Sequence, residues 1–448
     1  MLTDVIAALA TPPGRSAVAL VRLSGCGAFD VAAAVVRPFA PDAPRTARLA
    51  RLVHPLNGEA LDEALYTVYR APASYTGEDV VEIATHGGLL VPAEVLGALL
   101  VAGAREAAPG EFTRRALANG KIDLVQAEAI ADLVDATAPA QRRTALHALD
   151  RGLSAQVAAL RARVLELETL ISYDIDFPEE DGGPVAPERV DRAVDDLREL
   201  LEGLVGTARE GARLREGALV VIAGRPNVGK SSLFNALLGT DRAIVTEVPG
   251  TTRDAIEAPA TCGGFPFRLI DTAGLRDGAG RLESLGIEVS RRYLAAADLV
   301  VYCIETGARA SEDEMRFIRD LGTRGIVVRT KADLAESEPA TDRDTLPVSA
   351  HTGAGLESLR RRLAQQAFST LAGMGDVSPV VTRERQRIAL ERALQEVNGF
   401  AAARRQGVDA TVAATHLRAA VTSLEDVIGV VMRDDVLDRL FATFCVGK

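Results

Sequence analysis

Residues 224–232 read GRPNVGKSS, and the rest of the chain can be interpreted around this stretch. It follows an apolar run at 219–223 and precedes SLFNALLG, which predicts a helix ending at Gly239. A glycine loop between a strand and a helix is the setting in which the pattern GxxxxGK[ST] binds phosphate. Successive N–H groups curl around one anion, and the helix adds its positive end. We expect Lys230 to reach the β- and γ-phosphates and the Ser231 hydroxyl to bind Mg²⁺.

Three further motifs follow predicted strands in the same region. DTAG at 271–274 follows an apolar run, which places Asp271 to hold the metal ion and the Gly274 amide to face a γ-phosphate. TKAD at 330–333 and SA at 349–350 each follow another apolar run. A carboxylate at Asp333 can accept from N1–H and the 2-amino group of guanine, which adenine does not offer. Four elements in this order resemble the small-GTPase-like domain.

The third motif departs from the usual pattern at its first residue. GTPases of this kind generally have asparagine there, whereas this chain has Thr330, which carries a hydroxyl and no amide. Because some GTPase families also have threonine at this place, we expect guanine specificity to be retained. We expect Ser349 and Ala350 to meet the guanine edge through their backbone.

Length and charge limit the remaining possibilities. The chain has 448 residues, about three domains by length, and a net charge of −11. An acidic total does not attract nucleic acid, so any RNA contact must be a local patch or be shared with a partner. The longest apolar run, 87–104, contains Pro92 and Glu94 and predicts a buried helix, not a membrane span. The N-terminus lacks the early basic residues of a secretory signal, so the expected location is cytoplasmic.

Lysine is rare in this chain, and its positions are informative. Of 51 basic residues only Lys121, Lys230, Lys331 and Lys448 are lysine, and the rest are arginine. A coding bias towards arginine would leave lysine where a compact ammonium is required. Two of the four lie in the nucleotide motifs, which makes Lys121 and Lys448 functional candidates. The alternative is that these two are chance surface residues.

Hydrophobic periodicity divides the chain into three predicted domains. Residues 1–120 indicate mixed α/β structure, with strands at 17–23, 64–69 and 80–84 and a turn at 86–88. Residues 121–215 and 371–448 are helical, with a long helix at 141–172, a second at 188–209, and N-caps at Asp123 and Thr382. Residues 216–370 alternate strand and helix. Neither helical half has an evident core of its own, so we expect one discontinuous all-α domain into which the P-loop GTPase domain is inserted.

The hydrolytic machinery differs from that of the common switch proteins. In Ras-like GTPases a glutamine directly after DxxG orients the attacking water, whereas this chain has Leu275. Glu283, in the glycine-containing stretch LRDGAGRLESLG, is the candidate for positioning the water. The alternative is that Glu283 is a carboxylate in the first turn of a helix.

A monovalent cation can supply the charge that an arginine finger provides elsewhere. Asn227 in the phosphate loop is placed to help hold such an ion. Residues 246–254, TEVPGTTRD, form the expected effector loop, in which Thr252 would bind Mg²⁺. Thr246, Val248 and Thr251 are the expected partners of Asn227 around a potassium ion.

The whole chain resembles the tRNA-modification GTPase family called MnmE or TrmE. The resemblance rests on TPPGR, VRLSG, YTGEDVVEI, HGG, PGEFTRRA, NGKIDLVQAEAIADL, GRPNVGKSS, VPGTTRD, DTAGLR and the terminal FCVGK. It implies a homodimer joined through N-terminal α/β domains that bind a 5-formyl- or methylene-tetrahydrofolate. It also implies nucleotide domains that pair across potassium. The flavoprotein MnmG is the implied partner in adding a carboxymethylaminomethyl-type group to C5 of the wobble uridine of certain tRNAs, and the resemblance implies a heterotetramer of the two proteins.

The family pattern assigns residues by position. The folate contacts match Arg22, Glu82, Lys121 and Lys448, so the resemblance and the lysine argument agree. Cys445 falls at the terminal cysteine of the family, where a role in modification and simple packing of the tail both remain open; Val446 is a mild departure. The residues expected to bind GTP are Asn227, Val228, Gly229, Lys230, Ser231, Ser232, Thr246, Glu247, Val248, Pro249, Gly250, Thr251, Thr252, Asp271, Thr272, Ala273, Gly274, Thr330, Lys331, Ala332, Asp333, Ser349, Ala350 and His351.

Two other functions compete with this interpretation. A ribosome-assembly GTPase would use hydrolysis only to time its release, but such proteins usually append a basic RNA-binding domain, and this chain is acidic. A folate-binding scaffold with a vestigial nucleotide domain is disfavoured by the intact Lys230, Ser231, Thr252 and Asp271.

Overall fold

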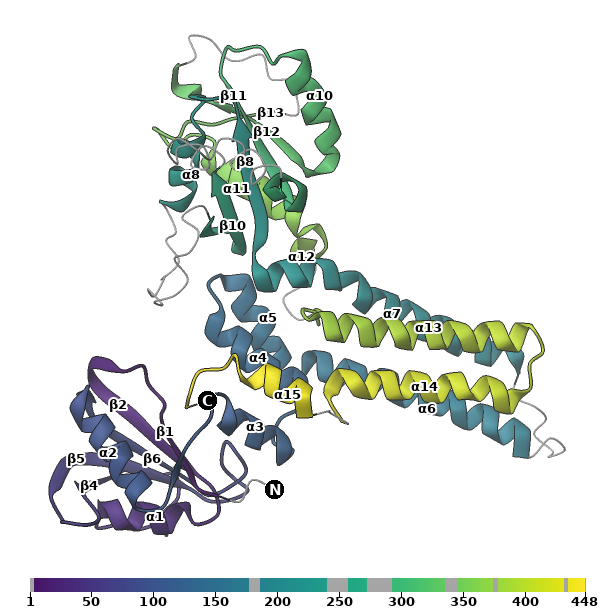
Figure 1. Cartoon of the computed structure of the whole chain (residues 1–448). Coiled ribbons are helices and arrows are strands. Elements are labelled where there is room, and N and C mark those ends of the chain that lie inside the picture. Colours follow the sequence, from purple (N-terminus) through teal and green to yellow (C-terminus); the bar gives the residue numbers. More distant parts are fainter. Residues whose placement is uncertain are drawn as a thin grey trace. The chain divides into compact units, whose positions relative to one another are not determined.

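The computed structural model describes residues 4–176, 186–239, 257–271, 292–334, 345–373, 378–430 and 434–447. The chain forms two compact units (Figure 1). The first, here called the N-terminal unit, combines Met1–Ala131 with Ile428–Lys448. The second, Asp132–Val427, holds a helical bundle and the P-loop domain. The domain boundaries expected from the sequence stay a prediction.

The N-terminal unit is built on a mixed sheet with strand order β3-β4-β5-β6-β2-β1-β7. Its elements are β1 (Ile6–Leu9), β2 (Gly14–Ser24), α1 (Ala28–Val35), β3 (Val36–Arg37), β4 (Arg48–Val53), β5 (Ala60–Tyr69), β6 (Val80–Gly88), α2 (Leu90–Val101) and β7 (Arg105–Glu106). Helices α1 and α2 pack on one face, where Val21, Ile83 and Leu99 are buried in a shared core. Since side chains alternate along a strand, Arg22 and Glu82 lie on the opposite face.

The predicted strands of this unit fall within β2, β5 and β6, but the turn expected at 86–88 is wrong. Strand β6 continues to Gly88, pairing His86 with Val18 and Gly88 with Gly14 of β2. The main-chain N–H of His86 also donates to the Asp62 carboxylate at 2.8 Å. Long-range pairing therefore keeps this glycine-containing stretch extended.

The C-terminal segment of the N-terminal unit, Ile428–Lys448, contains α15 (Asp434–Phe441). This helix packs against α3 (Glu111–Ala118) and α4 (Leu124–Asp135). Asp123 caps α4 as predicted, because its carboxylate accepts from the Gln126 N–H while the Gln126 side chain accepts from the Asp123 N–H. Phe441 and Phe444 are buried with Ala127. This cluster holds the C-terminal segment against the first 131 residues.

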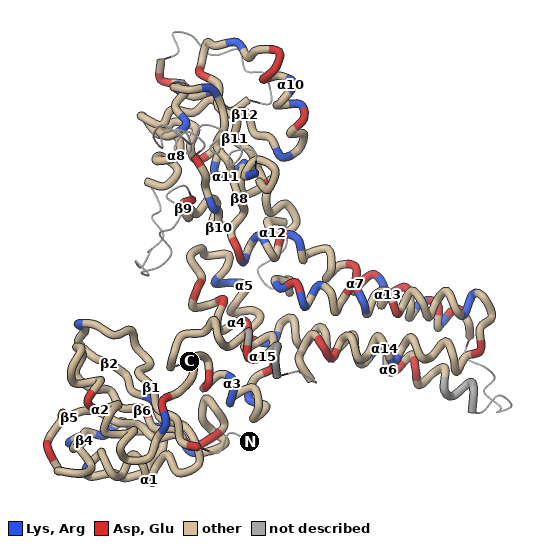
Figure 2. Tube along the Cα trace, viewed as in Figure 1, with Lys and Arg blue, Asp and Glu red and all other residues tan. Residues whose placement is uncertain are grey.

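The bundle of the second unit consists of α5 (Pro139–Leu149), α6 (Gly152–Asp176), α7 (Pro187–Glu216), α13 (Glu384–Arg405) and α14 (Ala410–Ile428). Its halves come from both sides of the P-loop domain, and α7 lies beside α13 (Figure 1). Acidic and basic residues are intermixed along these two helices (Figure 2). Some of them form ion pairs between the two helices, such as Arg404–Asp191 at 3.1 Å.

Two expectations for these helices are wrong. The single helix predicted at 141–172 is broken between α5 and α6, because Arg151 adopts a left-handed conformation with φ of 66°. The N-cap of α13 is Arg383 instead of Thr382. The Gln386 side chain accepts from the N–H groups of both Thr382 and Arg383, just before the helix begins.

The P-loop domain is a sheet with order β13-β12-β11-β8-β10-β9, in which only β9 is antiparallel among the described strands. Its elements are β8 (Ala218–Gly224), α8 (Lys230–Leu238), β9 (Glu257–Cys262), β10 (Phe265–Asp271), β11 (Leu299–Glu305), α10 (Glu312–Leu321), η1 (Gly322–Arg324), β12 (Gly325–Thr330), η2 (Ala332–Leu334), β13 (Thr345–Pro347), α11 (Leu356–Ala367) and α12 (Ser369–Gly373). Buried clusters cover both sheet faces. Parallel strands bring their carboxyl ends to one edge, where the nucleotide motifs lie.

Candidate functional site

The phosphate loop joins β8 to α8 and approaches the neighbouring strand closely. A Cβ at Gly224 would lie 2.5 Å from the Cys303 carbonyl oxygen of β11, so only glycine fits there. Gly229 caps the start of α8 with φ of 98°, and Asn227 has φ of 62°. These left-handed residues make the backbone curl before the helix begins. The loop therefore has the conformation expected of a phosphate cradle.

Two side chains at the start of α8 are held by hydrogen bonds to neighbouring groups. Lys230 is 7% exposed, and its ammonium donates to the Arg225 carbonyl at 2.7 Å. The Ser231 hydroxyl donates to the Asp271 carboxylate, with 2.6 Å between the oxygens. Asp271 ends β10, which is paired in parallel with β8. A hydroxyl and a carboxylate side by side are hard oxygen donors that suit Mg²⁺.

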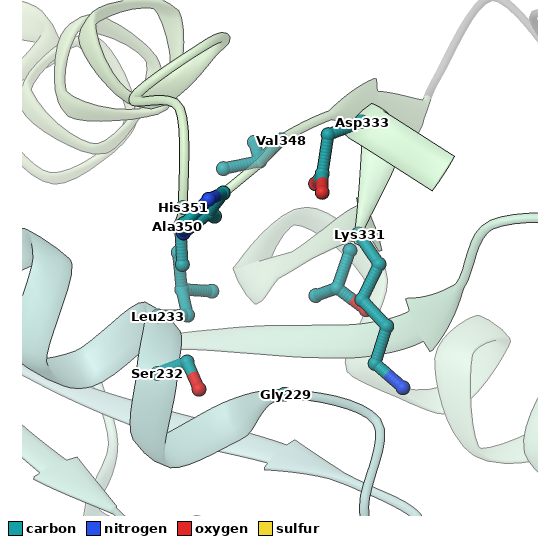
Figure 3. Close-up of a pocket in the computed structure, with 9 residues that line it drawn as sticks. Gly229, Ser232, Leu233, Lys331, Asp333, Val348, Ala350 and His351 are labelled. Carbon is teal, nitrogen blue, oxygen red and sulfur yellow. The ribbon is translucent and has the colours of Figure 1, made fainter. Parts of the chain in front are cut away.

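A cavity of about 130 Å³ lies next to the phosphate loop (Figure 3). Figure 3 shows Lys331 and Asp333 on one side, Ala350 and His351 on the other, and Ser232 at the start of α8. The remaining lining residues are Gly229, Leu233, Thr330 and Val348. The TKAD and SA motifs therefore meet around one small space adjoining the phosphate cradle.

The Asp333 carboxylate is kept ionised by its neighbours. A hydrogen bond from Ser349 lowers the pKa of Asp333, and its own backbone and His351 act in the same direction. Ala332 is held in place by a hydrogen bond from its N–H to the Val348 carbonyl at 3.2 Å. An ionised carboxylate fixed at the cavity wall is an acceptor for two adjacent N–H donors.

The phosphate loop is also held by residues that the sequence reasoning did not single out. Arg225 donates to Glu314 at 2.5 Å, and the Tyr302 hydroxyl donates to the same carboxylate at 3.0 Å. Burial, then the Glu314 carboxylate, raises the pKa of Tyr302 to about 12, so the hydroxyl stays protonated. The one available signal was Glu314 three residues after Ser311, a capping-box pattern at the start of α10.

A second cluster surrounds Arg22 in the N-terminal unit. Arg22 pairs with Glu82 on the adjacent strand at 2.8 Å and donates to the Gly447 carbonyl at 3.3 Å. Its guanidinium lies 5.5 Å from the Tyr75 ring centre and 5.7 Å from that of Phe112. The structure thus brings together two residues of the expected folate set and the C-terminal tail.

Lys121 and Cys445 occupy exposed positions in the same unit. The Lys121 ammonium donates to the Pro72 carbonyl at 2.8 Å, and its stem covers Gly77. Cys445 is an exposed free thiol whose carbonyl accepts from the Gly110 N–H at 3.4 Å. The second contact holds the tail to the start of α3, and among the described residues no hydrogen bond or ion pair joins Lys121 to Arg22.

Two family models match this chain. The model described as GTP-binding protein TrmE N-terminus covers residues 5–121, and the MnmE helical domain model covers 124–445. The protein named tRNA modification GTPase MnmE from Moorella thermoacetica is 42% identical over 100% of both chains. Its namesake from Methylorubrum populi is 44% identical over 99% of this chain and 98% of the relative. The chain belongs to the MnmE family.

Membership of the MnmE family confirms the predicted fold class: an N-terminal α/β domain and a helical domain with an inserted P-loop domain. Among solved structures, the G domain of the T. maritima FeoB iron transporter is 31% identical, over 34% of this chain and 98% of that one, with a TM-score of 0.26. No helix in the described part of this MnmE-family chain is long and apolar enough to cross a membrane.

Several residues that the MnmE resemblance assigns lie outside the described residues. They are the effector-loop positions Thr246, Glu247, Val248, Pro249, Gly250, Thr251 and Thr252, then Thr272, Ala273, Gly274, Glu283 and Lys448. Their roles stay predictions. The described members of the nucleotide set come from four separate motifs, and the fold gathers them at one edge of the sheet.

Proposed function

We propose that this chain hydrolyses GTP and that hydrolysis drives tRNA modification. The observation that carries the proposal is the single site formed by Lys230, the Ser231–Asp271 pair and the Asp333 cavity. Lys230 would bind the β- and γ-phosphates, and Ser231 with Asp271 would hold Mg²⁺, which offsets charge on the phosphate oxygens. Asp333 would select guanine. The curated relatives bear the name tRNA modification GTPase.

The test has a biochemical and a cellular part. Purified protein should bind GDP and GTP with Mg²⁺ present and should release phosphate from GTP. Mass spectrometry of tRNA from a strain lacking the gene should show loss of a carboxymethylaminomethyl-type group at C5 of the wobble uridine. Unchanged wobble uridine together with defective ribosomal subunits would instead favour a ribosome-assembly switch.

Hydrolysis is proposed to require potassium and pairing of two P-loop domains. Asn227, Thr246, Val248 and Thr251 would hold the ion, and Glu283 would position the attacking water because Leu275 cannot. The rate in KCl should therefore greatly exceed that in NaCl, and equal rates would end this part of the proposal. Glu283→Ala should slow turnover without weakening GTP binding.

The N-terminal unit is proposed to bind a tetrahydrofolate near Arg22, Glu82, Lys121 and Lys448. A guanidinium suits the carboxylates of such a ligand, a carboxylate suits its ring N–H groups, and the nearby aromatic rings suit its flat ring system. Titration with 5-formyltetrahydrofolate should show binding that Arg22→Ala weakens. Undiminished binding by that variant would move the site elsewhere.

The open face of the N-terminal sheet supports a homodimer. Leu49 and Leu65 are register partners on adjacent strands and are 60% and 47% exposed, on the face that α1 and α2 leave uncovered. A second copy would remove these leucines from water. Leu65→Glu should shift the mass in light scattering from dimer to monomer.

The flavoprotein MnmG is the proposed second partner of this chain, and co-purification of the two proteins from cells tests that interaction.

A further inference from the structure

Thr330 lines the Asp333 cavity and also contacts the phosphate loop. It is the last residue of β12, it is 4% exposed, and it is the first residue of the TKAD motif. Its hydroxyl oxygen lies 2.5 Å from the Val228 carbonyl oxygen and 3.3 Å from the Ile304 carbonyl oxygen. A hydroxyl has one proton to donate, so the shorter contact, to the phosphate loop, is the hydrogen bond.

The Val228 carbonyl controls the direction of a neighbouring donor. In a trans peptide the C=O and the following N–H point in opposite directions. Fixing the Val228 carbonyl towards Thr330 therefore turns the Gly229 N–H away from Thr330. Gly229 directly precedes Lys230 and caps α8, where N–H groups are expected to receive phosphate.

Thr330 is itself firmly anchored. Its carbonyl accepts from both the N–H and the hydroxyl of Thr306, at 3.0 Å and 2.7 Å. The next residue, Lys331, pairs with Glu305 at 2.8 Å. The end of β12 is thus tied to the end of β11, which gives the hydroxyl a fixed point from which to hold the phosphate loop.

We propose that Thr330 is a positioning residue for the phosphate loop and makes no selective contact with the base. The inference rests on the proposed binding of guanine nucleotides. It assigns to Thr330 the orientation of the amides that meet the β-phosphate. The loss of nucleotide affinity on substituting Thr330 should then depend on the number of phosphates in the nucleotide and not on its base.

The test compares Thr330→Val, which keeps the shape and removes the hydroxyl, with Thr330→Ser, which keeps the hydroxyl. Competition binding with GDP and with GMP measures both variants. Thr330→Val should weaken GDP by about ten-fold and leave GMP within about two-fold, because one buried hydrogen bond to the phosphate loop is lost. Thr330→Ser should retain GDP binding.

Asp333→Ala is the matched control, since a base contact should weaken GDP and GMP equally. Equal weakening of both ligands by Thr330→Val, or undiminished GDP binding, would overturn the inference. Should the valine variant not fold, Thr330→Ala carries the same GDP-to-GMP comparison. A wild-type protein that binds no GDP would refute the proposed function itself, which is a separate outcome.

Discussion

Buried cations are held differently at the phosphate loop and in the N-terminal unit. Lys230 donates to a main-chain carbonyl only five residues away. Arg115, which is 1% exposed, instead bonds to the carboxylates of Asp4, Glu78 and Glu111. The Arg225 carbonyl is a neutral acceptor, whereas the three partners of Arg115 carry negative charge. Removing Arg115 would leave the buried Glu111 carboxylate with one fewer positive partner, and Asp4 and Glu78 without this ion pair.

This difference separates a binding arrangement from a structural one. At Lys230 a bound phosphate would replace the hydrogen bond to the Arg225 carbonyl, which can accept from water or another donor instead. Around Arg115 the opposite charges of the guanidinium and the carboxylates offset each other. Arg105 adds a further ion pair with Glu111 at 2.8 Å. Substitutions at the phosphate loop should therefore affect activity, and substitutions at Arg115 should affect folding of the N-terminal unit.

The largest expected effect is on catalysis. Lys230→Ala should lower GTP turnover on the order of 10³-fold, because it removes a charged donor aimed at the phosphates. Lys230→Arg should fail almost as badly, since a planar guanidinium does not replace a compact ammonium in the loop. Phosphate release measures both variants. An arginine variant with wild-type turnover would contradict the argument from rare lysines.

The next effect is on the stability of the N-terminal unit. Arg115→Met should destabilise it by about 3 kcal/mol, because the buried Glu111 and the more exposed Glu78 and Asp4 all lose this partner. Arg48→Met is the matched control: Arg48 pairs with the exposed Asp42 at 3.9 Å, so its loss should cost less than about 1 kcal/mol. Hydrogen exchange of peptides from β2 and α3 reports on this unit, and GDP affinity should be unchanged. Similar losses in the two variants would remove the contrast.

Base recognition should change by an intermediate amount. Asp333→Asn should weaken GDP by roughly 10- to 100-fold, because the amide presents a donor where guanine also has donors. The same variant should gain affinity for xanthosine diphosphate, whose C2 oxygen can accept from that amide. Competition binding with both nucleotides provides the measurement. A variant that loses both ligands equally would indicate a damaged cavity.

The smallest effect is on acid stability. Hydrogen bonding to Arg105, then to Arg115 and against the opposing effect of burial, lowers the pKa of Asp4 to about 2. A lowered folded pKa gives stability that is present above the unfolded pKa of about 4 and is lost as the pH falls towards about 2. Because Asp4 is half-exposed, we expect a loss of about 1 kcal/mol. Between those pH values the free energy of unfolding of the N-terminal unit should change less with pH in Asp4→Asn than in the wild type. Unfolding measured at several pH values tests this.

How well each region could be predicted depends on how far apart in the sequence its contacting residues lie. The strand at 219–223, the helix ending at Gly239 and the Asp123 cap are local features, and the structure confirms them. Strand β4, RLARLV, was missed because arginines interrupt its apolar residues, and it is stabilised by pairing with β5. The break at Arg151 was missed because the leucine spacing continues across it.

The sequence by itself determined the family, the order of the nucleotide motifs and the insertion of one domain into another. The family and the motifs depend on short stretches whose residues act with their nearest neighbours along the chain. The insertion follows from the order of those stretches in the sequence. Only the tertiary structure decided that Arg22 meets Glu82, 60 residues away, and Gly447, 425 residues away. It also decided that the Thr330 hydroxyl faces the phosphate loop. Such contacts depend on which strands become neighbours, and that is set by burial of the whole core.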